Sequence, residues 1–161
     1  MPLLLLFAWG GDNLTKTPTS KSTEIESDES PVATIPLRRY WNGITTDYLT
    51  IAQPIVDLGA PAQGYMFQGI EGHIFPVQQP DTVPLKLFWN AKRKDYLTTT
   101  ANAVPVGYVM VRVEGFVFTN QHPGTVPLRL FWRAEWQDFF ATTGNPGFGY
   151  VHIGIVGYVF P

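Results

Sequence analysis

One pattern occurs three times along this chain, and it restricts the possible folds more than any other feature. Each copy opens with a Pro-Leu pair, has a Trp five residues after the Pro, and has an Asp eleven residues after it. A variable loop, a Gly-Tyr pair, a second Gly eight residues after the first and a closing aromatic residue follow. These landmarks are Pro36, Pro84 and Pro127; Trp41, Trp89 and Trp132; Asp47, Asp95 and Asp138; Gly64, Gly107 and Gly149; Gly72, Gly115 and Gly157; and Phe75, Phe118 and Phe160. Because the spacing is kept on both sides of the loop, the chain contains three internal repeats, at about residues 35–78, 83–121 and 126–161.

Within each repeat, the residue pattern predicts four short β-strands. In the second repeat these are "PLKLFWN", "DYLTTT", "GYVMV" and "VEGFVF", rich in β-branched and aromatic residues and separated by Gly, Pro and Asn. No segment has the apolar period of a helix. Three such repeats predict an all-β domain of twelve strands with pseudo-threefold symmetry, and a β-trefoil suits this count best. A three-bladed propeller is the formal alternative, although propellers typically have at least four blades.

The repeats are preceded by an N-terminal arm, residues 1–34, so the folded domain is expected to span residues 35–161. Residues 16–34 are rich in Ser, Thr, Glu and Asp and have no apolar period, which predicts a flexible acidic linker. The segment before them has two interpretations. Its apolar run, "PLLLLFAW", fits a short signal sequence, although no Lys or Arg precedes it and no A-x-A-like cleavage site follows. Alternatively, "PLLLLFAWGGDNLT" resembles a degenerate half-repeat.

Composition excludes several classes of function. The chain has 161 residues, of which 45% are hydrophobic, enough for one domain with a core. Its formal net charge of -2 gives no electrostatic basis for binding nucleic acid, and no basic amphipathic segment favours membrane insertion. Cysteine is absent, so disulfides, thiol nucleophiles and thiolate metal sites are excluded. Every Ser lies in the linker, and the three His residues have no repeat-equivalent positions, so no Ser-His-Asp arrangement is expected.

The Asp that starts the second strand of each repeat has two interpretations. Glycoside hydrolysis needs two neighbouring carboxylates, and we expect threefold symmetry to keep Asp47, Asp95 and Asp138 well apart. We therefore predict a domain that is not an enzyme and has no cofactor and no metal. An Asp beside aromatic rings is suited to binding sugar hydroxyl groups. An Asp that leaves a turn also bonds neighbouring backbone N–H groups, and this interpretation is favoured.

Alternation along the first strand separates two faces. The face of Leu85, Leu87 and Trp89 is the expected core, with the repeated Trp residues filling a barrel. The opposite face combines a cation, a ring and an Asn or Arg, and it is expected to be partly exposed. With the Asp, this face gives the candidate ligand-binding residues: Arg38, Tyr40, Asn42 and Asp47; Lys86, Phe88, Asn90 and Asp95; Arg129, Phe131, Arg133 and Asp138. The alternative is a solvated strand face whose ring packs under a neighbouring hairpin.

The residue before the second Gly differs between repeats. It is Glu71, Glu114 or Val156, and a position that accepts both Glu and Val is not expected to be dictated by the fold. The Gly itself is expected to allow a bend or bulge between strands.

The segments "VPLRLFWR", "KDYLTT" and "RVEGFVF" and the connector "QQPDTVPL" resemble a family of three-repeat domains of unknown function. Members occur in fungi, bacteria and some animals, often beside secreted or hydrolytic domains. The resemblance covers about residues 31–161 and implies a lectin-like β-trefoil in an extracellular setting, without an established reaction. Family members have Gly-Asp-His-Phe-Tyr-Thr-Thr at the second strand. This chain keeps the Asp but has Tyr48, Tyr96 or Phe139 in place of the His, so a role of that His does not carry over.

Together these observations predict a carbohydrate-binding module with up to three weak, repeat-related sites and a glycan or glycoprotein as partner. The alternative is a structural or protein-interaction domain without a sugar site. A third interpretation is an inhibitor or toxin-associated domain that acts through the unique loop "IAQPIVDLGAPAQG". Sugar identity and oligomeric state do not follow from the sequence.

Overall fold

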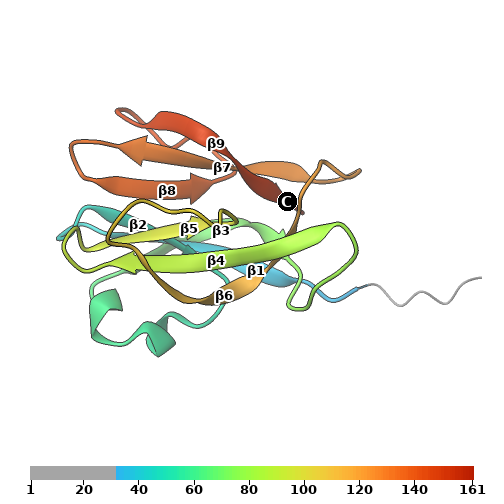
Figure 1. Ribbon diagram of the computed structural model, residues 1–161, viewed down its shortest axis with the longest axis horizontal. Helices are drawn as coiled ribbons and strands as arrows, with labels where there is room; N and C mark the ends of the chain where they lie inside the picture. Colours follow the sequence, from blue (N-terminus) through green and yellow to red (C-terminus); the bar gives the residue numbers. More distant parts are fainter. Residues whose placement is uncertain (1–31) are drawn as a thin grey trace, which may run out of the picture. The chain divides into compact units, whose positions relative to one another are not determined.

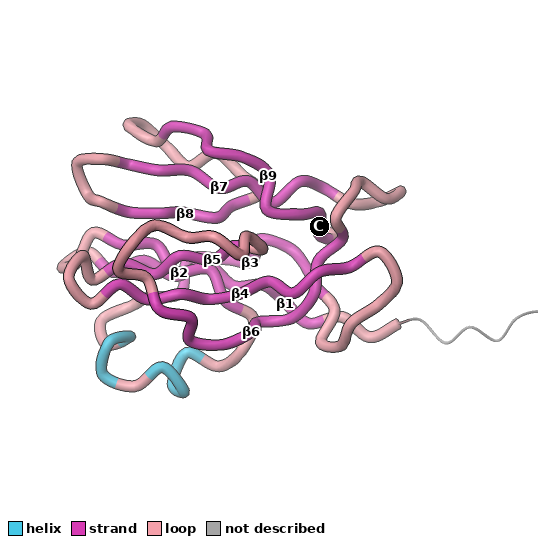
Figure 2. The backbone as a smooth tube through the Cα atoms, in the orientation of Figure 1, coloured by secondary structure: helices cyan, strands magenta, loops and turns pink. Residues whose placement is uncertain are grey.

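The protein is an all-β domain, as predicted. A computed structural model describes residues 32–161 (Figures 1 and 2). Its strands form two antiparallel sheets, one ordered β2-β1-β3 and one ordered β5-β4-β6-β9-β7-β8. The strands are β1 (Ile35–Asn42), β2 (Asp47–Ile51), β3 (Met66–Ile74), β4 (Thr82–Asn90), β5 (Asp95–Thr99), β6 (Val109–Phe118), β7 (Val126–Arg133), β8 (Asp138–Thr142) and β9 (Val151–Val159). Two 3-10 helices, η1 (Ile55–Leu58) and η2 (Ala60–Ala62), lie in the unique loop of repeat one.

Each repeat folds as three strands, not the four that the sequence predicted. The first strand pairs with the second on one side and with the third on the other. The predicted third and fourth strands form one continuous strand, whose pairing with the first strand has two register shifts in each repeat. At the second shift the skipped residue stands directly before the second Gly, at Glu71, Glu114 and Val156. The expected bulge at this Gly is thus confirmed.

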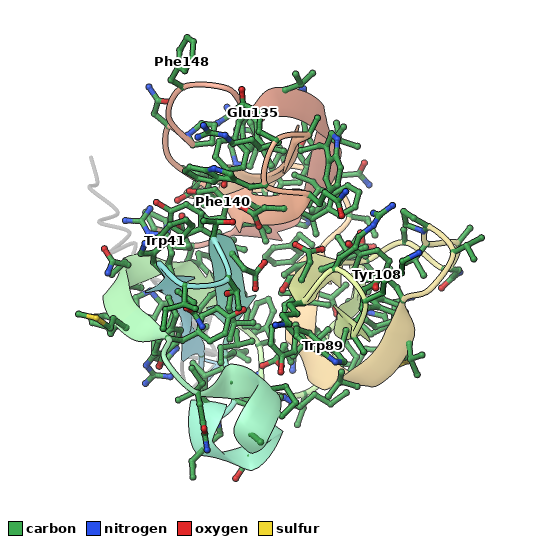
Figure 3. The ribbon with its side chains drawn as sticks, turned by 90° about the vertical axis from the view of Figure 1, so that its left-hand side faces the viewer. Trp41, Trp89, Tyr108, Glu135, Phe140 and Phe148 are labelled. Carbon is green, nitrogen blue, oxygen red and sulfur yellow. The ribbon has the colours of Figure 1, made fainter. Side chains whose placement is uncertain are left out.

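The second Gly also allows close approach between repeats. A Cβ atom on Gly115 would lie 2.6 Å from the carbonyl oxygen of Phe75 in repeat one. Gly72 and Gly157 meet the equivalent segments of repeats three and two, so the three contacts form a cycle. The closing rings pack edge to face in the same cycle, with centroid distances of 5.2, 5.7 and 5.9 Å among Phe75, Phe118 and Phe160. Figure 3 shows the three repeats arranged around a common centre.

The predicted core face is confirmed for its leucines but not for its tryptophans. Leu37, Leu85 and Leu128 are fully buried at equivalent positions. The repeated Trp residues are only half-buried, because each lies at the turn end of its strand. Each packs on the residue that follows the Asp, with centroid distances of 4.5, 4.4 and 4.4 Å for the pairs Trp41–Tyr48, Trp89–Tyr96 and Trp132–Phe139.

The opposite face of the first strand is more buried than predicted in repeat two. Lys86 and Phe88 are buried, as are Leu85 and Leu87, so both faces of β4 are covered. Phe88 belongs to the main hydrophobic core, and the ammonium group of Lys86 donates to the Oδ1 atom of Asn102 at 2.6 Å. In repeats one and three, the corresponding cation and ring are half-buried.

The predicted signal sequence, half-repeat and acidic linker lie almost entirely outside the described residues. Within residues 32–161, no helix has the length and apolar character needed to cross a bilayer.

Candidate functional site

The three repeated carboxylates meet at the centre of the domain. Asp47, Asp95 and Asp138 begin β2, β5 and β8, and all three are buried. One carboxylate oxygen from each lies within 4.8 Å of the others. The expectation that symmetry would keep these residues apart was wrong, because the three strands that carry them pack against one another at the common centre of the repeats. We call these residues the Asp cluster.

Each member of the Asp cluster accepts hydrogen bonds from its own repeat and from another repeat. Within the repeat, the donor is the hydroxyl of the Gly-Tyr pair, in the pairs Tyr65–Asp47, Tyr108–Asp95 and Tyr150–Asp138. Across repeats, the donor is the backbone N–H that follows the next Asp: Tyr96 to Asp47 at 3.4 Å, Phe139 to Asp95 at 3.0 Å and Tyr48 to Asp138 at 3.2 Å. The donors are not neighbours in the same turn, as the favoured interpretation had expected, so the Asp cluster joins the repeats.

The Gly-Tyr pair positions the hydroxyl for this contact. Gly64, Gly107 and Gly149 have φ values of 85°, 95° and 88°, which side-chain-bearing residues rarely adopt. A Cβ atom on Gly107 would also lie 2.9 Å from the amide nitrogen of Asn90. The glycine therefore reverses the chain tightly, and the Tyr after it reaches the Asp of its own repeat.

Burial dominates the electrostatics of the Asp cluster. It raises the pKa of Asp95 to about 6 and the pKa of Asp138 to about 7. Burial, together with the nearby charges of Asp95 and Asp138, raises the pKa of Asp47 well above its usual range. The pKa values of Tyr65, Tyr108 and Tyr150 are also raised, first by burial and then by the adjacent carboxylate. The tyrosine hydroxyls therefore keep their protons and donate, and protonation of at least one carboxyl is favoured at neutral pH.

Three carboxylates are also a ligand set that suits a hard divalent cation. Within residues 32–161, the Asp cluster is the group of acidic and His side chains close enough to share one. Its oxygens already accept hydrogen bonds from tyrosine hydroxyls and backbone N–H groups. A cation would have to replace those donors.

The predicted Asn ligands close turns. The Oδ1 atom of Asn42 accepts the N–H groups of Ile44 and Thr45 at 3.0 and 3.3 Å. Asn90 closes the equivalent turn at 3.1 and 3.1 Å. Arg133, which replaces them in repeat three, instead donates to the carbonyl oxygen of Phe148 at 3.0 Å. These side chains support the hairpin turns.

The structure disperses the remaining candidates along the hairpins. Arg38 donates to the carbonyl oxygen of Ala52 at 3.2 Å. Tyr40 packs on Phe67, and Phe131 on His152, at centroid distances of 5.8 and 5.3 Å. Lys86 and Phe88 are buried as described, and Arg129 lies within β7, paired with Thr142 and Ile155. Of the predicted set, only the Asp residues are brought together across all three repeats.

Two hollows lie where one repeat meets the next. The first boundary hollow, between repeats one and two, has a volume of about 420 Å³. It is lined by Asn42, Thr45, Ala60, Pro61, Gln63, Trp89, Ala91 and Lys94. The second boundary hollow, between repeats two and three, has a volume of about 530 Å³. It is lined by Asn90, Ala91, Lys92, Arg93, Val106, Gly107 and Gln137.

The two hollows occupy equivalent places in the repeat. Four lining positions correspond in pairs: Asn42 and Asn90, Thr45 and Arg93, Gln63 and Val106, Lys94 and Gln137. At the third boundary, Trp136 stands where the others have Thr45 and Arg93. Its ring contacts Trp41 at a centroid distance of 5.3 Å, and the guanidinium carbon of Arg133 lies 3.4 Å from the ring centroid. Trp136 therefore fills the equivalent place at the third boundary.

Both hollows present polar side chains, and the first is also lined by a ring. Gln63, Lys92, Lys94 and Gln137 are exposed. Trp89 lines the first hollow, whereas Trp132 has the guanidinium carbon of Arg93 5.5 Å from its ring centroid. Sequence reasoning missed these hollows because each combines two repeats, and the first also uses the variable loop. No pattern within a single repeat indicates them.

Two buried glutamates join repeats at the bulge. The Oε2 atom of Glu114 accepts the N–H groups of Ala52 and Gln53 at 2.9 and 2.8 Å, and its Oε1 atom pairs with Arg112 at 2.6 Å. Glu71 makes the equivalent contacts, accepting the N–H of Thr143 at 2.7 Å and pairing with Arg39 at 2.9 Å. The expectation that the fold does not use this position was wrong for both Glu residues. Val156 has no carboxylate, so the boundary between repeats two and three lacks these contacts and keeps the bond from the Thr100 hydroxyl to the carbonyl oxygen of Val156, at 2.7 Å.

The chain matches no protein-family model, no curated protein and no solved structure in the comparisons made.

Proposed function

We propose that residues 35–161 form a β-trefoil that binds carbohydrate and catalyses no reaction. The observation that carries this proposal is the recurrence of a hollow with polar side chains at two equivalent repeat boundaries. The cyclic contacts of the closing phenylalanines and of the Asp cluster support the trefoil architecture.

Sugar recognition needs a ring that packs on the C–H face of a pyranose and polar groups that bond its hydroxyls. In the first boundary hollow, Trp89 supplies the ring, and the exposed Gln63 and Lys94 supply hydrogen-bonding groups. The second hollow has the donors Arg93, Lys92 and Gln137 but no ring among its lining residues, so stacking on a sugar is proposed for the first hollow only. The proposal therefore moves the binding site from the predicted strand face to the boundaries and gives the Asp cluster a structural role.

The proposed partner is a glycan or glycoprotein. Both hollows are lined in part by exposed side chains. Each is expected to bind weakly, and two equivalent sites on one domain give avidity toward a multivalent glycan. The family resemblance supports an extracellular setting.

Changing Trp89 to Ala is expected to weaken glycan binding at least tenfold, because it removes the ring against which the sugar packs. Binding is measured first on a glycan array and then by calorimetry with the glycan selected there. Trp41→Ala is the matched control, since Trp41 contacts Trp136 at the filled boundary. A wild-type chain that binds nothing on the array would refute the proposal, and so would equal losses in the two folded variants.

A protein-interaction domain is the second candidate, and exposed apolar side chains favour it. The first halves of β3, β6 and β9 expose such side chains at equivalent repeat positions. They are Met66, Phe67 and Ile70; Val109, Met110, Val111 and Val113; Val151, Ile153 and Ile155. If the chain binds no glycan on the array, the protein-interaction function is favoured.

A further inference from the structure

A separate apolar cleft lies between repeats two and three. Its volume is about 350 Å³. It is lined by Leu97, Thr99, Ala101, Ala103, Val104, Pro105, Leu130, Trp132, Phe139 and Ile153. None of these residues lines the second boundary hollow. The cleft is thus a distinct feature with almost no polar wall.

The equivalent place at the first boundary is filled by the chain itself. There, Ile55 and Leu58 of η1 pack against a cluster that contains Leu87 and Tyr96. Leu87 and Tyr96 are the repeat equivalents of the cleft residues Leu130 and Phe139. The loop of repeat two is shorter and has no counterpart of η1, so the apolar wall stays open.

The equivalent place at the third boundary is polar. Arg39 replaces the leucine of the other repeats and pairs with Glu71 at 2.9 Å. Phe140, which corresponds to Leu97, stacks on Tyr48 at a centroid distance of 4.1 Å. The lining at that boundary therefore differs in character from the apolar cleft.

The boundary with the cleft also has fewer hydrogen bonds between repeats. The hydroxyls of Thr50 and Thr98 donate to the backbone of the neighbouring repeat at 2.7 and 2.6 Å. Ala141 stands at this position in repeat three, and Val156 replaces the joining Glu. Two side-chain hydrogen bonds still cross this boundary, from the Thr100 hydroxyl to the carbonyl oxygen of Val156 at 2.7 Å and from the Phe139 N–H to Asp95 at 3.0 Å.

A basic turn lies beside the cleft. Lys92, Arg93 and Lys94 are consecutive, whereas the equivalent turns read "ITT" and "EWQ". The guanidinium carbon of Arg93 lies 5.5 Å from the ring centroid of Trp132, a cleft residue. Arg93 forms no ion pair with another part of residues 32–161. A positive charge therefore stands next to an open apolar wall.

We propose that this cleft binds a small amphipathic organic anion. The apolar body occupies the cleft between Leu130 and Val104, and the carboxylate faces Arg93. A volume of about 350 Å³ lies at the small end of the range typical of ligand pockets. Burial of apolar surface drives such binding, and the guanidinium gives a carboxylate charge-assisted hydrogen bonds. This site shares Arg93 with the second boundary hollow. It shares no residue with the first hollow, where Trp89 lies, so octanoate binding and glycan binding at Trp89 can fail independently.

The test is a titration of the whole chain with sodium octanoate, followed by methyl NMR. The methyl signals of Leu97, Leu130 and Ile153 are expected to shift together and saturably. Octanol, which lacks the charge, is expected to bind about tenfold more weakly. If these methyl groups do not respond to octanoate, or if octanol binds equally well, the proposal is overturned.

Two variants with matched controls sharpen the test. Ala103→Trp fills the cleft and is expected to abolish the octanoate response, whereas Ala134→Trp, in the exposed turn of repeat three, is expected to leave it unchanged. Arg93→Ala is expected to weaken octanoate binding about tenfold, and Lys92→Ala much less. Unchanged octanoate binding in Ala103→Trp or in Arg93→Ala would contradict the placement. The methyl shifts of the unmodified chain decide the question if a variant does not fold.

Discussion

Replacing Glu114 with Val, the residue that repeat three has at this position, is expected to lower the free energy of unfolding by about 3 kcal/mol. Glu114 is fully buried and accepts two backbone N–H groups of repeat one. Its removal leaves those groups without their acceptor and leaves the largely buried Arg112 without its carboxylate. Removing one member of a buried ion pair is costly because the remaining charge stays desolvated.

The measurement is chemical denaturation of the wild type and the variant. Glu135→Val is the matched control, since Glu135 is exposed and its ion pair with Arg133, at 2.9 Å, is expected to contribute little. The double variant Glu114→Val with Arg112→Val is expected to recover part of the loss. Equal stability of Glu114→Val and Glu135→Val would show that the Glu114 carboxylate does not stabilise the contact between repeats one and two.

The second large effect is a dependence of stability on pH that originates in the Asp cluster. Burial raises the pKa of Asp95 to about 6 and that of Asp138 to about 7, from an ordinary value of 3.8. At pH values between 3.8 and about 7, the folded chain binds more protons than the unfolded chain. The free energy of unfolding therefore falls as the pH rises through this range. One extra bound proton corresponds to about 1.4 kcal/mol per pH unit. The melting temperature is therefore expected to be several degrees higher at pH 5 than at pH 8.

Asp138→Asn tests the origin of this effect. An Asn oxygen can still accept the N–H of Tyr48, and the side chain no longer titrates. The variant is expected to lose much of the dependence between pH 5 and pH 8, and its stability relative to the wild type is expected to be greatest at pH 8. Asp57→Asn, on the exposed η1 helix, is expected to behave as the wild type. A wild-type melting temperature that does not fall with rising pH would contradict the described protonation.

The sequence pattern was sufficient to predict the units of the fold. The constant spacing of the Pro-Leu pair, the Trp and the Asp predicted three repeats and their first two strands. Alternation along the first strand also predicted the buried Leu37, Leu85 and Leu128. These features depend on local periodicity, which is visible in a single repeat.

Contacts between repeats were not predictable in the same way. A single repeat does not show that its Asp lies at the common centre, so Asp47, Asp95 and Asp138 were expected to be far apart. The bulge position was misjudged for the same reason, because the partners of Glu71 and Glu114 belong to other repeats. The candidate hollows and the apolar cleft also lie between repeats.

The differences among the three boundaries are what make particular sites. Trp136 fills the hollow at the third boundary, and η1 fills the apolar place at the first. The boundary between repeats two and three has no counterpart of Trp136 or of η1, and Val156 stands there in place of the Glu that joins the other repeats. The triplicated pattern therefore builds the domain, and departures from the pattern leave space for ligands.

The most direct test of this account follows the indole N–H signals of the tryptophans by NMR while the glycan selected on the array is added. The signal of Trp89, which lines the first boundary hollow, is expected to shift, and those of Trp41 and Trp136 to remain in place. Shifts confined to Trp41 and Trp136, or no shift at any indole despite binding, would contradict the placement of carbohydrate at the open boundaries.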